Sequence, residues 1–187
     1  NIGLGCTGNP ELVEEAGRIT ATEVAGTGLD WAFAPCIAVP RDERWGRTYE
    51  GFGETPELAV EMGAAAVRGL QGAIEGDPKR VLACAKHYVA DGATEYGKDG
   101  GDARISEEEL RRIHLPGYIA AIKAGVGSIM VTYSSWNGER MHVNRYLITD
   151  VLKGELGFQG IVASDWAAAD YLPGKYEDKV ESLINAG

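Results

Sequence analysis

Short apolar runs alternate with amphipathic segments along this chain of 187 residues. The apolar runs predict four buried strands, which span residues 29–39, 80–88, 127–133 and 160–165. Apolar residues at helical spacing predict helices over residues 10–26, 55–74, 144–156 and 176–185, and a further helix that begins at Ser106. Asn9 before Pro10, and Ser106 three residues before Glu109, are typical helix starts. The segments 91–104 and 134–142 are predicted loops.

The alternation of strands and helices predicts βα units around a parallel sheet. We expect the apolar residues 2–4 to be the remnant of a further strand. Polar residues suited to binding or reaction lie at or just after the strand ends, namely Arg47, Glu50, Lys86, His87, Tyr133 and Asp165. A (β/α)8 barrel builds its active site at this face, whereas the GxGxxG of a dinucleotide-binding sheet is missing. A complete barrel needs about 250 residues. The sequence therefore predicts an α/β fold, a partial TIM (β/α)8 barrel of four to five βα units.

No linker or low-complexity segment divides the chain, so we expect residues 1–187 to form a single domain. The chain opens on Asn1 without Met and holds about half the strands of a barrel. Both observations favour an internal fragment of a larger barrel, whose first part lies before Asn1.

Composition limits the classes of partner. Hydrophobic residues make up 44% and charged residues 25% of the chain, as in a globular domain. The net charge of −10 and the absence of any basic run argue against nucleic acid and against an anionic membrane surface. A neutral or polar substrate fits this charge better than a polyanion. No signal peptide or membrane-spanning run is visible in the sequence.

Cysteine, histidine and acidic residues show no metal-binding pattern. The cysteines lack CxxC spacing and are expected to be small buried residues near strands: Cys6, Cys36 and Cys84. The histidines lack ligand-like spacing: His87, His114 and His142. Acids in the glycine-rich loop lack the order of an EF-hand and are expected to be solvated: Asp91, Glu95, Asp99 and Asp102. We therefore expect no metal and no other cofactor.

Asp165 is the prime candidate for a reacting group. It ends a buried strand, where an unpaired carboxylate would cost several kcal/mol, so it is expected to face a pocket. A carboxylate can attack an anomeric carbon, and Trp166 beside it offers a flat face for a sugar ring. The alternative is that Asp165 merely caps a following helix.

Lys86 and His87 are adjacent at another strand end and could donate hydrogen bonds to sugar hydroxyls. Two other readings remain open here. Lys86 could form a Schiff base in a barrel lyase or aldolase, or it could simply pair with a nearby carboxylate. The protein could also be a non-catalytic sugar-binding protein, with Trp166 and Arg47 as its contact surface.

Arg47 carries five donors in a rigid fork, which suits vicinal hydroxyls or a carboxylate partner. It could equally form an ion pair with Glu50 that orders the loop, and the two roles are compatible. Tyr133 could donate a hydrogen bond to Asp165 and hold it ionised, or it could be a buried core residue. Trp136 and Met141 are expected to shape the pocket rim.

Four ordered segments together resemble the N-terminal barrel domain of glycoside hydrolase family 3. They are Ala34–Pro35 with Arg44–Glu50, then Ala85–Val89, Val131–Gly138 and Gly160–Trp166. The resemblance covers nearly the whole chain and is nearest to the β-glucosidase and exo-β-glucanase branch. It implies a retaining β-glycosidase that hydrolyses O-glycosyl bonds at the non-reducing end of a β-glucoside or β-glucan oligosaccharide.

The resemblance also implies roles for individual residues. Asp165 is the expected catalytic nucleophile. The expected substrate-binding residues are Arg47, Lys86 and His87 on sugar hydroxyls, Tyr133 against the nucleophile, and Trp166 beside the sugar.

Two departures from the family pattern sharpen this expectation. The hexosaminidase branch takes its acid/base from a His-containing loop, but the corresponding residues 91–97 contain no histidine, which favours the glucosidase branch. In that branch the acid/base Glu belongs to a C-terminal domain, and a further sugar-binding Asp would precede Asn1. We therefore expect the C-terminal domain to be a partner of this chain and the isolated fragment to be inactive or nearly so. A periplasmic or secreted location is favoured over a cytoplasmic one, although the sequence does not identify the compartment.

Overall fold

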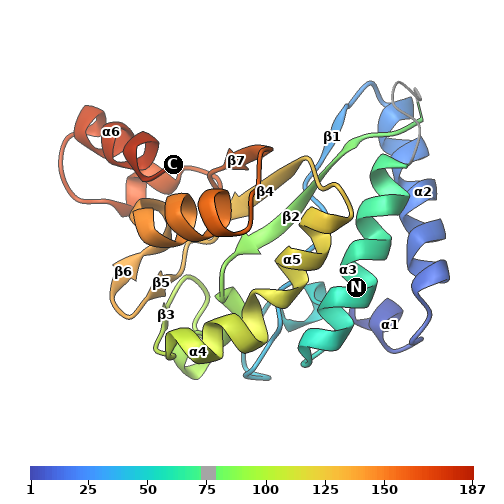
Figure 1. The fold of residues 1–187 in the computed structure, drawn as a ribbon, viewed down its shortest axis with the longest axis horizontal. Coiled ribbons are helices and arrows are strands. Elements are labelled where there is room, and N and C mark those ends of the chain that lie inside the picture. Colours follow the sequence, from blue (N-terminus) through green and yellow to red (C-terminus); the bar gives the residue numbers. More distant parts are fainter. Residues whose placement is uncertain (73–78) are drawn as a thin grey trace.

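A four-stranded parallel sheet forms the centre of the computed structural model, which describes residues 1–72 and 79–187 (Figure 1). The strand order is β1-β2-β4-β7, with β1 at Trp31–Ala32, β2 at Leu82–Tyr88, β4 at Ser128–Val131 and β7 at Ile161–Ala163. All three strand pairs are parallel. A strand lies within each of the four predicted apolar runs, and each strand is shorter than its run.

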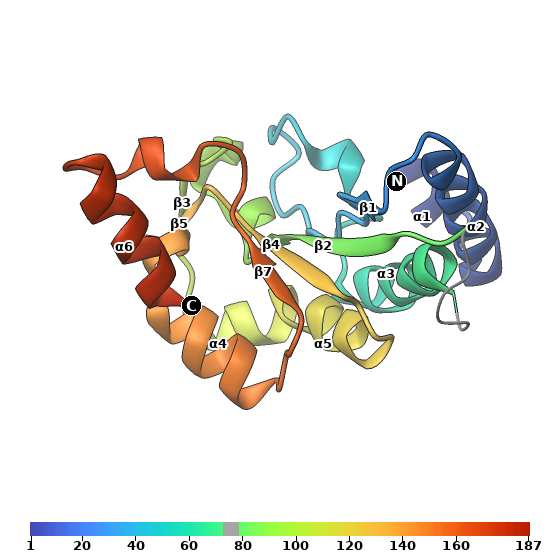
Figure 2. The same cartoon turned by 90° about the horizontal axis from the view of Figure 1, so that it is seen from above.

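Helices cover one side of this sheet, where Figure 2 shows α3 (Pro56–Gln71), α5 (Pro116–Lys123) and the orange helical segment of residues 146–155. The longer helical segments are α2 (Pro10–Gly26), α3 (Pro56–Gln71), α4 (Glu107–Glu109) continued by the π-helix η4 (Leu110–His114), α5 (Pro116–Lys123), the π-helix η6 (Tyr146–Glu155) and α6 (Tyr176–Ala186). Short 3-10 turns lie at η1 (Thr48–Glu50), η2 (Asp91–Ala93), η3 (Glu95–Gly97), η5 (Met141–Val143) and η7 (Ala168–Tyr171). The predicted alternation of strand and helix is therefore observed.

The predicted helix starts are confirmed by their caps. The side chain of Asn9 accepts a main-chain N–H at 3.0 Å, and that of Ser106 accepts one at 3.1 Å. Helix α3 ends at Gln71, and Gly72 follows in the left-handed region with a φ of 65°. Ile74, where we expected this helix to end, lies outside the described residues.

The first predicted strand is interrupted soon after it begins. Beyond β1, the segment 29–39 keeps a few main-chain hydrogen bonds to β2, and its next bridge is an isolated one between Cys36 and Lys86. Pro35 lies between these two pairings and has no main-chain N–H to donate to a neighbouring strand. Its peptide bond to Ala34 is cis. The prediction of one continuous strand over 29–39 is therefore wrong.

The N-terminal apolar residues form a helix rather than a strand. Helix α1 (Ile2–Gly5) satisfies its main chain locally, because the N–H of Gly5 donates to the carbonyl oxygen of Asn1 at 2.9 Å. Gly5 also packs so closely on Phe52 that a Cβ would lie 1.7 Å from the Phe52 carbonyl oxygen. The expected strand remnant at residues 2–4 is wrong for these two reasons.

A second, three-stranded sheet lies in segments that we expected to be loops. It consists of β3 (Asp102–Ala103), β5 (Ser135–Trp136) and β6 (Glu139–Arg140) in the order β3-β5-β6. Strands β5 and β6 form an antiparallel hairpin around Asn137 and Gly138, which have φ angles of 50° and 90°. An Asn-Gly pair favours this kind of turn. The hairpin fixes the residues that follow it, including His142.

The main core lies between the sheet and its helices. Within it, Tyr88 of β2 and Tyr118 of α5 pack edge to face, with ring centroids 5.0 Å apart. Cys36 and Cys84 are buried as predicted, whereas Cys6 is exposed just after α1. Burial raises the pKa of the Cys36 thiol to about 12. None of the described helices is both long enough and apolar enough to cross a membrane.

Candidate active site

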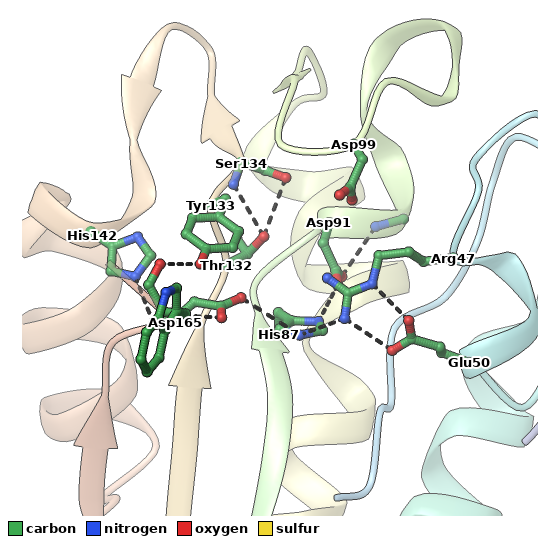
Figure 3. Close-up of polar contacts among 12 residues, drawn as sticks. Arg47, Glu50, His87, Asp91, Asp99, Thr132, Tyr133, Ser134, His142 and Asp165 are labelled. Carbon is green, nitrogen blue, oxygen red and sulfur yellow. Dashed lines mark hydrogen bonds and ion pairs between the residues drawn. The ribbon is translucent and has the colours of Figure 1, made fainter. Parts of the chain in front are cut away.

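A pocket of about 380 Å³ lies at the carboxyl ends of the central strands. It is lined by Phe33, Arg47, Lys86, His87, Met130, Tyr133, Ser164, Asp165, Trp166 and Ala167. All six residues predicted for the site are among them. Figure 3 shows several of these side chains beyond the tips of the strands, pointing toward one another.

Asp165 lies two residues beyond the end of β7, with its side chain 15% exposed. Its Oδ1 accepts the N–H of Trp166 at 2.7 Å, and its own N–H donates to Nε2 of His142 at 3.1 Å. The next helical turn, η7, has Ala167 as its N-cap. Asp165 therefore does not cap that turn, and its second oxygen faces the pocket side of His87, at 3.8 Å from Nε2.

Arg47 and His87 form the opposite wall, and each is bonded to a carboxylate that does not line the pocket, Glu50 and Asp91 respectively. Arg47 donates to both oxygens of Glu50, at 2.8 and 2.9 Å, so the predicted ion pair is confirmed. The same guanidinium contacts Nε2 of His87 at 2.9 Å, and Nδ1 of His87 contacts Asp91 at 2.9 Å. Because guanidinium can only donate, Nε2 accepts and Nδ1–H donates. His87 is therefore held as the neutral Nδ1–H tautomer.

The charges of Arg47 and Glu50 stabilise one another. The hydrogen bond from Arg47 holds the pKa of the Glu50 carboxyl below its usual range, and the Glu50 carboxylate raises the pKa of Arg47. Of the Arg47 nitrogens, Nε and Nη2 make these contacts. Within the described residues Nη1 makes no hydrogen bond, so its two N–H groups are available to a ligand.

Tyr133 follows β4 and lies beside Asp165. Its hydroxyl donates a hydrogen bond to the main-chain oxygen of Trp166. Burial raises the pKa of Tyr133 to about 12, and the Asp165 charge adds to the increase. The Trp166 side chain is 86% exposed at the pocket edge. Tyr133 therefore holds the main chain next to Asp165, while the Trp166 ring stays open to a ligand.

Lys86 and His87 both line the pocket from the end of β2, and the peptide bond between them is cis.

The expectation that Trp136 and Met141 shape the pocket rim was wrong. Met141 is fully buried, and Trp136 donates its indole N–H to the carbonyl oxygen of Ile105 at 3.0 Å. Neither is among the residues that line the pocket.

Sequence reasoning missed two residues of the site. Asp91 was expected in a solvated loop, but it is 4% exposed and also accepts the N–H of Gly92 at 3.1 Å. Its spacing of four residues from His87, directly after a strand, was the available signal. His142 was considered only as a metal ligand. Among the residues that the structure describes, no three His, Cys, Asp or Glu side chains gather as a metal site would require.

Known proteins that match this chain are glycoside hydrolases. The family described as "Glycosyl hydrolase family 3 N terminal domain" matches residues 1–187. A periplasmic beta-glucosidase of Salmonella typhimurium is 38% identical over 192 residues, which cover all of this chain and 25% of that protein. A lysosomal beta glucosidase of Dictyostelium discoideum is 38% identical over 199 residues, which cover all of this chain and 24% of that protein.

Solved structures agree with this match. A mutant of the exo-1,3/1,4-beta-glucanase ExoP from a Pseudoalteromonas species superposes with a TM-score of 0.96 at 46% identity, over all of this chain and 31% of that chain. A beta-glucosidase from Listeria innocua in complex with glucose superposes with a TM-score of 0.95 at 33% identity, over 99% of this chain and 27% of that chain.

These neighbours confirm the predicted α/β fold as part of a TIM barrel. The chain spans about a quarter of the length of the curated relatives named above. The match of the family over the whole chain and the identity with its members lead to one assignment. This chain belongs to glycosyl hydrolase family 3, within the N-terminal domain of that family.

Proposed function

We propose that the complete protein is a retaining β-glycosidase, a β-glucosidase or exo-β-glucanase, in which Asp165 is the nucleophile. The observation that supports this most directly is the position of Asp165. Within the described part of the chain it is the one carboxylate that lines the pocket at the strand ends. Relatives of this chain are named as beta-glucosidases and an exo-1,3/1,4-beta-glucanase, and one neighbour is in complex with laminaribiose.

In this mechanism Oδ2 of Asp165 attacks the anomeric carbon. Oδ1 already accepts the N–H of Trp166, whereas Oδ2 lies on the pocket side, 3.8 Å from Nε2 of His87. Attack forms a bond between Oδ2 and the sugar and breaks the bond to the leaving oxygen, which must gain a proton. Water then hydrolyses the glycosyl-enzyme, so the product keeps the β configuration.

The general acid must be a second carboxyl group, about 5–5.5 Å from the first in retaining enzymes. Nearby carboxylates on this chain are engaged elsewhere. Glu50 is held by two nitrogens of Arg47, Nε and Nη2, and buried Asp91 is bonded to His87. We therefore place the acid/base outside residues 1–187, in a further domain of the complete protein. The much greater length of the relatives supports this placement.

Arg47 and Lys86 would bind hydroxyls of the terminal sugar, while His87, whose two ring nitrogens bond to Arg47 and Asp91, would contact the sugar through its ring. The free Nη1 of Arg47 and the ammonium of Lys86 present donors to hydroxyl groups on one side of the pocket. The exposed ring of Trp166 would cover the sugar on the Asp165 side. A neutral sugar with several hydroxyls meets these requirements without any cofactor. The names of periplasmic and lysosomal relatives support a location outside the cytoplasm.

The test uses the complete protein and an aryl β-glucoside. Asp165→Asn should lower kcat by at least about 10³-fold, because the covalent step is lost. Asp170→Asn, an exposed acid in the adjacent turn η7, is the matched control and should keep full activity. A 2-deoxy-2-fluoroglucoside should label the peptide that contains Asp165. Residues 1–187 alone should show little or no turnover.

Other results would replace the proposal. Full activity of Asp165→Asn would exclude Asp165 as the nucleophile. Borohydride trapping of a substrate on Lys86 would indicate a lyase or aldolase. Glucose binding without hydrolysis of any β-glucoside would indicate a sugar-binding protein.

A further inference from the structure

His142 reaches the site from a segment that is distant in sequence from Asp165. It lies in the turn η5, directly after the β5–β6 hairpin, and is 6% exposed. Its ring lies against that of Tyr133, with centroids 6.0 Å apart and planes tilted by 40°. Figure 3 shows His142 on the side of Asp165 away from Arg47 and His87. The imidazole is thus fixed before it contacts Asp165.

The contact is made to the main chain of Asp165. Strand β7 ends at Ala163, so the N–H of Asp165 lies beyond the last pair of the sheet. Within the described residues, its one acceptor is Nε2 of His142, at 3.1 Å. This N–H is partly buried, and a main-chain N–H withdrawn from water is costly without an acceptor. His142 therefore supplies the partner that the sheet no longer provides.

This contact requires a neutral imidazole. Nε2 can accept the N–H of Asp165 only if it carries no proton, which places the ring proton on Nδ1. Burial lowers the pKa of His142 to about 4, against the opposing effect of the Asp165 charge. Arg140 favours the neutral form as well. The acceptor is therefore present throughout the neutral pH range.

Two further hydrogen bonds fix the same turn. Oδ1 of Asp165 accepts the N–H of Trp166, and Tyr133 donates to the carbonyl oxygen of Trp166. With the His142 contact, the main chain is held on both sides of the Asp165 Cα. The direction of the carboxylate follows from these three contacts.

We propose that His142 is a positioning residue for Asp165, whose unprotonated Nε2 holds the main chain at the strand exit and so aims the carboxylate into the pocket. This inference rests on the proposed nucleophilic role of Asp165. His142 itself does not touch the substrate. Since a misplacement of about 1 Å can cost 10²-fold in rate, its loss should affect catalysis more than binding.

The test compares an acceptor with a non-acceptor at position 142 in the complete protein. His142→Leu removes the acceptor, and His142→Gln offers Oε1 near the position of Nε2. With an aryl β-glucoside, we expect kcat of the Leu variant to fall about 10- to 100-fold with KM within about threefold. The Gln variant should stay within about fivefold of the original kcat, because the same N–H is accepted again.

His114→Leu is the matched control. His114 is equally buried, in η4, but is not among the pocket residues. The Nε2 of His114 has no hydrogen-bond partner among the described residues, so this variant should fold and keep its kcat per folded molecule. If His142→Leu does not fold, His142→Met replaces it, with similar bulk and only a weakly accepting sulfur.

The outcomes separate this inference from the proposed function. Equal losses of kcat in the Gln and Leu variants, or a loss that also appears in His114→Leu, would overturn the positioning role. Unchanged kcat in His142→Leu, with Asp165→Asn inactive, would overturn it as well and leave the nucleophile in place. Full activity of Asp165→Asn would instead refute the proposed function.

Discussion

Replacing Asp91 by Asn removes a charge from behind His87 while keeping the shape of the side chain. Asp91 is 4% exposed, and its carboxylate accepts two hydrogen bonds, from Nδ1–H of His87 at 2.9 Å and from the N–H of Gly92 at 3.1 Å. The two bonds go to different oxygens, Oδ2 and Oδ1, so the one oxygen of an amide can accept only one of them. We expect the amide oxygen to keep the bond from His87, while its NH2 faces the N–H of Gly92. What changes is the strength with which the carboxylate holds His87.

The magnitude follows from the change in hydrogen-bond type. A hydrogen bond to a charged group contributes about 1.5–3 kcal/mol, and a neutral one about 0.5–1.5 kcal/mol. The bond from His87 to Asp91 should therefore weaken by about 1–1.5 kcal/mol. Because about 1.4 kcal/mol corresponds to a factor of ten, kcat/KM on an aryl β-glucoside should fall roughly tenfold.

The matched control is Asp102→Asn, an acid-to-amide change in the same acidic segment. Asp102 bonds the N–H of Gly138 and pairs with Arg104, and it is not among the pocket residues. Its kcat/KM should stay within about twofold of the original value. Equal kcat/KM values for the two variants would refute the idea that Asp91 acts through His87.

Three further predictions concern the same protein. Tyr133→Phe should lower kcat about three- to tenfold in steady-state assays, because one hydrogen bond beside the nucleophile is lost. Gly92→Ala should cost about 1–3 kcal/mol in thermal unfolding, because its Cβ would lie 2.4 Å from a main-chain oxygen, whereas Gly46→Ala has open space and should be neutral. Burial lowers the pKa of His142 and of His114 from 6.5 to about 4. Since the unfolded chain takes up protons first, the free energy of unfolding should fall as pH drops from about 6.5 to about 4, by up to about 3 kcal/mol for each histidine. Replacing both histidines by Gln should flatten that pH dependence, and an unchanged slope would contradict it.

The strand ends could be predicted because they depend on local pattern. The apolar runs before His87 and Asp165 identify buried strands, and the parallel arrangement brings their carboxyl ends to one edge. The family resemblance added roles that the pattern alone left open for Lys86 and Asp165. These predictions needed no knowledge of how the loops fold.

The missed contacts depend on loop geometry. Asp91 turns back to His87 because Ala90 adopts a left-handed conformation with a φ of 68°, which is uncommon for alanine. His142 reaches Asp165 only because a hairpin closes at Asn137 and Gly138. That Asn-Gly pair was a readable signal for the hairpin. The contact between His142 and Asp165 could not be predicted from the sequence, because tertiary packing determines it.

The His87 ring forms one hydrogen bond to Arg47 and one to Asp91, and so connects two residues that do not bond to each other. Arg47 requires an acceptor at Nε2, and Asp91 supports that state by taking the proton of Nδ1. Changes at Arg47 and Asp91 should therefore be thermodynamically coupled, with a double variant that differs from the sum of the single ones. A substitution accepted at one position in a related enzyme would alter which residues are tolerated at the other. Through this imidazole, positions 47 and 91 are expected to vary together among related enzymes, although they are far apart in the sequence.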